Sequence, residues 1–321
     1  MDCNERINSE NYVDLITQDP IRLGAEEVDL CYVNVDNNFS IAYVNRLNIA
    51  PIPENLYEYG HMPKLYGLID TTPSGKSISN TAFDASSLSA SGIIQIQRPP
   101  LALTGNGVLL CFIDTGIDYT NEIFQDENGN SRILAIWDQT IQDGTPPEGF
   151  FFGSQYRKED INLALASDDP YSIVPSRDEN GHGSVMASVA AGSRVDGGRS
   201  FLGAAPDCEI VVVKLKECKR NLREYYLLPD DVAAYSEHDI MLAVKYVDSF
   251  ALAYRRPIVI CMGIGTNMGS HGGHSALSVY LNNVAQNISR AVVMSGGNEG
   301  NAAHHYFGVL ERDATGVGYQ D

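Results

Sequence analysis

The chain has 321 residues, of which 44% are hydrophobic and 20% charged, as in an ordinary globular protein. Its formal net charge of -19 argues against binding to nucleic acid or to anionic membrane surfaces, because both need a basic patch. The first twenty residues lack the apolar segment of a secretory signal, and no apolar run approaches the roughly 18 residues of a membrane span.

The amino-terminal region, residues 1–85, is predicted to be a small α+β domain. Residues 10–17 are amphipathic and are expected to form one or two helical turns. Residues 30–35 and 40–47 alternate as strands do, and the polar residues 36–38 between them suit a hairpin turn. Residues 77–92 are rich in serine and alanine, which predicts an exposed linker and a domain boundary.

The second domain, residues 86–321, is predicted to be an α/β fold. Continuous apolar runs predict buried strands, and apolar residues at helical spacing predict helices. The strands are expected at 108–113, 209–215, 257–262 and 291–295, and the helices at 185–191, 239–254 and 275–286. This alternation indicates a parallel sheet covered by helices, with its active site at the carboxyl ends of the strands.

The six cysteines show neither CxxC pairs nor the spacing of a metal site. They are Cys3, Cys31, Cys111, Cys208, Cys218 and Cys261. Their distribution predicts a reduced compartment and no disulfide framework.

Three glycine-punctuated motifs fall where this architecture would place a site. Asp114 directly follows a predicted strand, although it could simply be a turn residue. His182 lies between glycines at the start of a predicted helix, whose dipole should favour the neutral ring that a general base needs. Asn298 lies in SGGNEG after another strand, where its amide could donate to an oxyanion or merely form a loop.

Together these motifs resemble the subtilisin family, in the chain order aspartate, histidine, serine. GVLLCFIDTGID resembles the aspartate motif, NGHGSVMASVAAG the histidine motif and SGGNEG the oxyanion loop. Val185 stands where the family usually has a second, non-catalytic histidine. The resemblance implies that Asp114 orients His182, that His182 is the general base, and that Asn298 binds the oxyanion.

The same resemblance implies two walls for the pocket that binds the substrate side chain before the cleaved bond. The first would be Gly263, Ile264 and Gly265, and the second Ser295, Gly296 and Gly297. A peptide or protein substrate is therefore expected, with no metal and no cofactor. Calcium stays open, because Asp126, Asn128 and Asn130 alternate but no glutamate completes a calcium loop.

No serine follows Asn298 in the printed sequence, whereas the family's nucleophile lies in a Gly-Thr-Ser segment after the oxyanion loop. We therefore expect that the sequence stops short of the nucleophile and that this portion alone is inactive. Two functions follow as hypotheses: a serine endopeptidase made as a zymogen, or a non-catalytic binding protein.

Residues 1–85 have the size and position of a subtilisin propeptide, which would occupy the active-site groove and be cut within residues 81–92. FSIAYVNRLNI, GTNMGSHGG and the lack of a signal resemble clostridial spore-germination proteases, which activate a cortex-degrading hydrolase. The resemblance implies synthesis in the cytoplasm and packaging in the spore.

Overall fold

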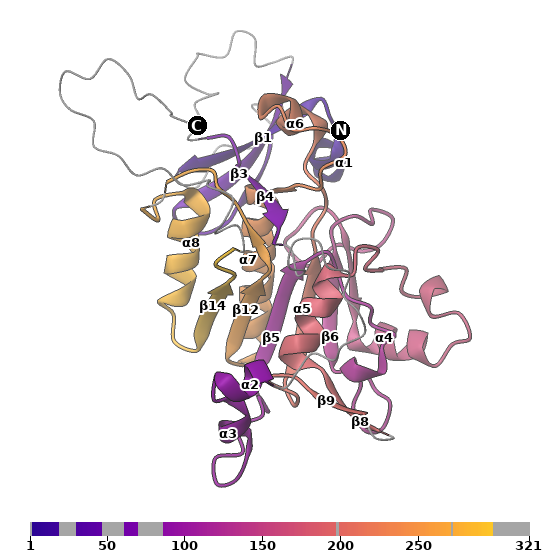
Figure 1. Cartoon of the computed structure of the whole chain (residues 1–321). Helices are drawn as coiled ribbons and strands as arrows, with labels where there is room; N and C mark the ends of the chain where they lie inside the picture. The colour runs from indigo at the N-terminus through magenta and orange to yellow at the C-terminus, as the bar shows by residue number, and fades with distance from the viewer. Residues whose placement is uncertain are drawn as a thin grey trace, which may run out of the picture.

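A computed structural model describes residues 2–18, 30–46, 61–69, 86–196, 199–270 and 272–297. Its centre is a six-stranded sheet in the order β14-β12-β5-β10-β6-β7 (Figure 1). The strands are β5 (Leu109–Asp114), β6 (Ile133–Asp138), β7 (Ser154–Arg157), β10 (Glu209–Lys214), β12 (Ile258–Met262) and β14 (Arg290–Met294). All neighbouring pairs are parallel except β6 and β7. The predicted α/β fold is confirmed, with one antiparallel edge strand that was not expected.

Helices cover both faces of this sheet. Alternate residues of β5 face opposite ways: Leu109, Cys111 and Ile113 pack with α7 (Glu237–Tyr254) and α8 (Ala276–Ala285). Leu110 and Phe112 pack instead with α5 (His182–Ala191) and α4 (Lys158–Leu165). All six residues of β5 are buried, which explains the unbroken apolar run that precedes Asp114.

The amino-terminal region forms a separate antiparallel sheet in the order β1-β3-β2. Its elements are α1 (Cys3–Asn8), β1 (Tyr12–Gln18), β2 (Leu30–Asn34) and β3 (Phe39–Asn45). The hairpin of β2 and β3 is confirmed. The expected helix at 10–17 is wrong, because residues 12–18 pair along their whole length with β3 and cross-strand pairing overrides a weak helical pattern.

A disulfide joins Cys3 in α1 to Cys31 in β2. The cysteine spacing did not predict this pair, since the two cysteines are 28 positions apart and are brought together only by the fold. The other four cysteines are free, and three of them are buried.

The described part of the linker predicted at 77–92 contains helical structure that was not expected. Residues 86–90 form α2 (Ser86–Ala90), and α3 (Ile93–Gln97) follows directly. The side-chain amide of Gln97 donates to the carbonyl of Gly203 over 2.8 Å, which fixes α3 against the body of the protein. The predicted boundary near residue 85 lies outside the described residues and stays a prediction.

A second small sheet has three strands in the order β11-β4-β13. Its middle strand, β4, lies beyond the carboxyl end of β5 (Figure 1). Its strands are β4 (Leu65–Leu68), β11 (Tyr235–Ser236) and β13 (Ile264–Gly265). The chain thus inserts an early segment, β4, between two segments of the later domain. The remaining elements are η3 (Glu122–Phe124), η4 (Pro170–Ser172), β8 (Ser193–Asp196), β9 (Arg199–Leu202) and α6 (Arg220–Tyr225).

The amino-terminal sheet packs on α7 and α8 through a shared apolar core, to which Ile7, Phe39 and Ile41 contribute. A buried ion pair also holds the amino-terminal sheet to the later domain. Asp14 of β1 pairs with Lys219 over 2.6 Å, and both side chains are buried. None of the helices within the described ranges combines the length and apolar character needed to cross a bilayer.

Candidate active site

Asp114 is the last residue of β5 and lies at the carboxyl end of the sheet, 1% exposed. Its Oδ1 accepts a 2.7 Å hydrogen bond from the backbone N–H of Thr115 and contacts Nδ1 of His182 at 2.7 Å. Within the described part of the chain, Oδ2 has no hydrogen-bond partner. The carboxylate is therefore held in place by its own turn and aimed at the histidine ring.

His182 is the first residue of α5 and is also buried. Gly181 precedes it with φ of +85°, a left-handed conformation that glycine adopts without strain. The next residue, Gly183, lies against the turn after β5: a Cβ there would come within 2.2 Å of the carbonyl oxygen of Gly116. These two glycines allow α5 to start directly beside Asp114.

The two partners of the ring set its protonation. Burial disfavours the charged imidazole, but the hydrogen bond and the charge of Asp114 outweigh it and raise the pKa of His182 above its usual 6.5. The carbonyl oxygen of Ile69, 2.8 Å from Nε2, adds to this rise. Both acceptors favour the charged ring and so act against the helix dipole, which favours the neutral one.

Asp178 fastens the aspartate turn to the histidine helix, and sequence reasoning missed it. Its Oδ1 accepts from the hydroxyl of Thr115 at 2.7 Å and from the N–H of Gly181 at 2.9 Å. Its Oδ2 accepts from the N–H and the hydroxyl of Ser184, at 2.8 and 2.6 Å. Burial disfavours the charge, but these bonds outweigh it and lower the pKa of Asp178. The only available signal was its place four residues before His182, which alone is not specific.

The first predicted pocket wall lies beside this pair. Gly263 follows β12, and a Cβ on it would lie 2.7 Å from Cε1 of His182 and 2.8 Å from Oδ2 of Asp114. Ile264 and Gly265 form β13, which pairs antiparallel with β4. The absence of a side chain at Gly263 therefore makes room for the histidine and aspartate together.

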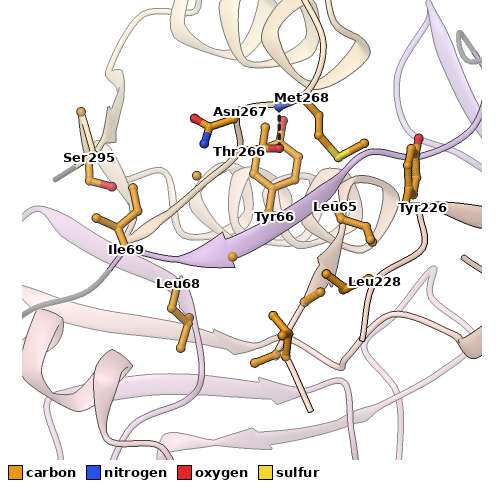
Figure 2. Close-up of a pocket in the computed structure, with 17 residues that line it drawn as sticks. Leu65, Tyr66, Leu68, Ile69, Tyr226, Leu228, Thr266, Asn267, Met268 and Ser295 are labelled. Carbon is orange, nitrogen blue, oxygen red and sulfur yellow. Dashed lines mark hydrogen bonds between the residues drawn. The ribbon is translucent and has the colours of Figure 1, made fainter. Parts of the chain in front are cut away.

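The second predicted wall follows β14. Ser295 donates its N–H to the carbonyl of Met262 at 3.3 Å, which holds the start of the loop next to β12. Ser295, Gly296 and Gly297 line the same cleft as Gly265 (Figure 2). Asn298 lies outside the described residues, so its role as oxyanion donor stays a prediction.

β4 runs between β11 and β13 and lines a cleft whose volume is about 630 Å³. Figure 2 shows Ile69 beside Ser295, and Tyr66 beneath the loop of Thr266 and Asn267. Tyr226, Leu228 and Met268 also line the cleft. An extended peptide of this chain thus lies where the two walls predicted to hold a substrate meet.

The loop considered for calcium forms a turn. Oδ1 of Asp126 accepts the backbone N–H groups of Asn128 and Asn130, both at 2.9 Å. Across the described ranges, no three His, Cys, Asp or Glu side chains gather closely enough to hold a metal ion.

Comparison with known proteins identifies the family. A sequence model of the subtilase family, peptidase family S8, matches residues 105–319. The chain belongs to the subtilase family. The ordered aspartate and histidine motifs of this subtilase chain lie within the matched region, and the predicted family and fold are thereby confirmed.

Among solved structures, the chain is similar to the CspB protease of Clostridium perfringens, with 34% identity and a TM-score of 0.58. The match covers 69% of this chain and 42% of that one. Fervidolysin of Fervidobacterium pennivorans, a keratinolytic enzyme related to subtilisin, matches at 15% identity and a TM-score of 0.45, over 92% of this chain and 41% of that one. This chain thus spans about two fifths of the length of either relative. No protein with a curated description is significantly similar to it.

Proposed function

We propose that the protein is a serine endopeptidase of the subtilase family, made as a zymogen. The observation that carries the proposal is the 2.7 Å contact between Nδ1 of His182 and Oδ1 of Asp114 beside a cleft that holds an extended peptide. Membership of a family of proteases supports peptides as the substrate class. A pure binding protein has no chemical need for a buried carboxylate aimed at an imidazole.

In this proposal Asp114 orients the ring so that Nε2 faces the cleft. Nε2 takes the proton of a serine hydroxyl while the oxygen attacks the substrate carbonyl, and later returns it to the leaving amine. The amide of Asn298 donates to the oxyanion; loss of the matching asparagine in subtilisin, a worked case for this family, costs about 10² to 10³ in turnover. Gly263 keeps the substrate backbone close to the imidazole, because it carries no side chain.

The nucleophile in this proposal is the serine of a Gly-Thr-Ser segment that follows the printed residues. The match covers only 42% of the CspB chain, so the remainder of that protein leaves room for such a segment.

We further propose that the amino-terminal region is an inhibitory propeptide. Three kinds of contact support this. β4 lies in the cleft and its neighbour Ile69 touches His182. The carboxylate of Glu237 accepts the N–H of Lys64 at 2.9 Å, just before β4. The buried pair of Asp14 and Lys219 holds the amino-terminal sheet to the later domain.

The test is labelling of the full-length gene product with a fluorophosphonate probe, which reacts with an activated serine. Labelling of one serine in the wild type, and its loss in His182→Ala, is the expected result. An unlabelled protein after the amino-terminal fragment has been stripped by denaturation and refolding would contradict the proposal. It would favour the second candidate, a non-catalytic binding protein, for which the supporting observation is the placement of β4 between β11 and β13, with Ile69 against His182.

For the biological role, we propose activation of a spore cortex hydrolase during germination, after cytoplasmic synthesis and packaging in the spore. The 34% identity to the clostridial CspB protease supports this assignment. Antibody detection in purified spores of the host is the measurement, and absence from spores would contradict it.

A further inference from the structure

The backbone carbonyl of Ile69 contacts the imidazole of His182. Its N–H donates to the carbonyl of Gly263 at 3.0 Å, and its carbonyl oxygen lies 2.8 Å from Nε2 of His182. Two residues earlier, Gly67 is paired antiparallel with Gly265. The backbone of residues 67–69 is therefore fixed against the cleft wall, with one particular carbonyl presented to the imidazole.

We propose that the protein cleaves its own chain at the carboxyl side of Ile69, and that the cleft selects an aliphatic side chain at this position. The proposal rests on the protease function and specifies its substrate. It replaces the expectation that processing occurs within residues 81–92.

The side chain of Ile69 fits an apolar pocket built from residues that lack bulk. A Cβ on Gly265 would come within 2.8 Å of Cδ1 of Ile69, so the isoleucine packs directly on that glycine. Ser295 lies beside it, followed by two glycines that also line the cleft (Figure 2). None of the described residues lining the cleft carries a charge. Ile69 is half-buried, so a charged side chain here would be partly desolvated without a partner, whereas an aliphatic one gains from the burial.

The segment of α2 and α3 is held far from His182. α3 is fixed by Gln97 to Gly203, and Gly203 donates its N–H to the carbonyl of Gly192 at the far end of α5. At 1.5 Å per residue, the ten residues of α5 separate that end from His182 by about 15 Å. Figure 1 accordingly shows α2 and α3 at the opposite end of β5 from β4.

The reaction balances with a serine hydroxyl and one water. The serine oxygen attacks the carbonyl carbon of Ile69 while its proton moves to Nε2 of His182. The bond from Ile69 to the next nitrogen breaks, and His182 delivers the proton to that amine. Water then hydrolyses the ester, which releases Ile69 as a free carboxylate and restores the serine. In the structure both ring nitrogens face acceptors, Asp114 and Ile69, which is the protonated arrangement that would hold such a carboxylate after the cut.

The test is intact-mass analysis and amino-terminal sequencing of the full-length gene product after expression. We expect one fragment that ends at Ile69 and a second that begins at Asp70. Ile69→Asp should slow this cut by roughly 100-fold, whereas the matched control Ile69→Leu should be processed at nearly the wild-type rate. Cutting only at another bond, or equal rates for the two variants, would overturn the proposal.

A peptide assay removes any effect of the variant on folding. Synthetic peptides with the sequence of residues 62–75, with Ile or Asp at position 69, are added to the processed wild-type enzyme. We expect cleavage after Ile69 in the first and at least tenfold slower cleavage of the second.

Probe labelling separates this proposal from the function on which it rests. A labelled enzyme that cuts its own chain elsewhere, or leaves it uncut, overturns the assignment of Ile69 and leaves the protease function standing. An enzyme with neither labelling nor cleavage overturns both.

Discussion

The carboxylate of Asp178 and the hydroxyl of Thr115 are joined by a 2.7 Å hydrogen bond. This hydrogen bond ties the turn after β5 to the loop before α5. Asp114 is the last residue of β5, and His182 is the first residue of α5. The same carboxylate accepts three further bonds from Gly181 and Ser184. The alignment of the predicted catalytic pair therefore depends on a residue that belongs to neither motif.

Replacement of Asp178 by alanine removes all four acceptor contacts. We expect the free energy of unfolding to fall by about 3 kcal/mol, because buried donors lose their partners. In the full-length protein kcat should fall by roughly 100-fold, since a small misplacement of the histidine is costly. Urea unfolding and peptide hydrolysis measure the two effects.

Glu179 provides the control, because its side chain is 69% exposed and its buried partner Lys214 also donates to the carbonyl of Arg177. Glu179→Gln should change stability by less than about 1 kcal/mol. Equal losses in the two variants would contradict the role assigned to Asp178.

Gly263→Ala tests the space shared by His182 and Asp114. The added Cβ would lie 2.7 Å from Cε1 of the ring, so the ring or the strand must shift. We expect kcat to fall by about 10- to 100-fold with KM changed much less. Gly296→Ala is the matched control, because its Cβ meets no described atom within 4 Å. Unaltered turnover in Gly263→Ala would show that the site tolerates the shift.

Asp14→Asn tests the charge that holds the amino-terminal sheet. Lys219 would remain buried without its carboxylate, 2.6 Å away in the wild type, and we expect a loss of about 3 kcal/mol in the free energy of unfolding. The amino-terminal fragment should also dissociate more readily in size-exclusion chromatography after processing.

The control is Arg220→Gln, which removes an exposed pair with Glu224 and should cost less than about 0.5 kcal/mol. Retention of the fragment by Asp14→Asn at wild-type strength would show that apolar contacts alone hold it.

The pH dependence follows from the raised pKa of His182. A group with a raised pKa contributes stability that is fully present below its usual 6.5 and is lost as the pH rises through the raised value. Asp114, Asp178 and the carbonyl of Ile69 all favour the charged ring. The Tm difference between the wild type and His182→Gln should therefore shrink as the pH rises above about 6.5. A Tm difference that grows with pH would contradict a protonated His182 ring in contact with Asp114 and Ile69.

The sequence predicted the large sheet well, because strands buried on both faces must be apolar throughout. β5, β10, β12 and β14 all begin and end within one or two residues of the expected ranges. β1 was mistaken for a helix, since its pairing partner β3 lies outside any local window. The helix at 86–90 was not predicted, because it has few large side chains.

For the site, the sequence alone determined the residue types and their order: an aspartate after a strand, a histidine between glycines, and glycine-rich walls. These are local features, fixed by turn geometry and by the need for close backbone approach. Only the tertiary structure decided which distant groups meet them: Asp178 behind the pair, Cys31 opposite Cys3, and Ile69 against His182. These contacts join residues that are 28 to 113 positions apart in the sequence. The local spacing of residues therefore cannot predict which of them meet in the fold.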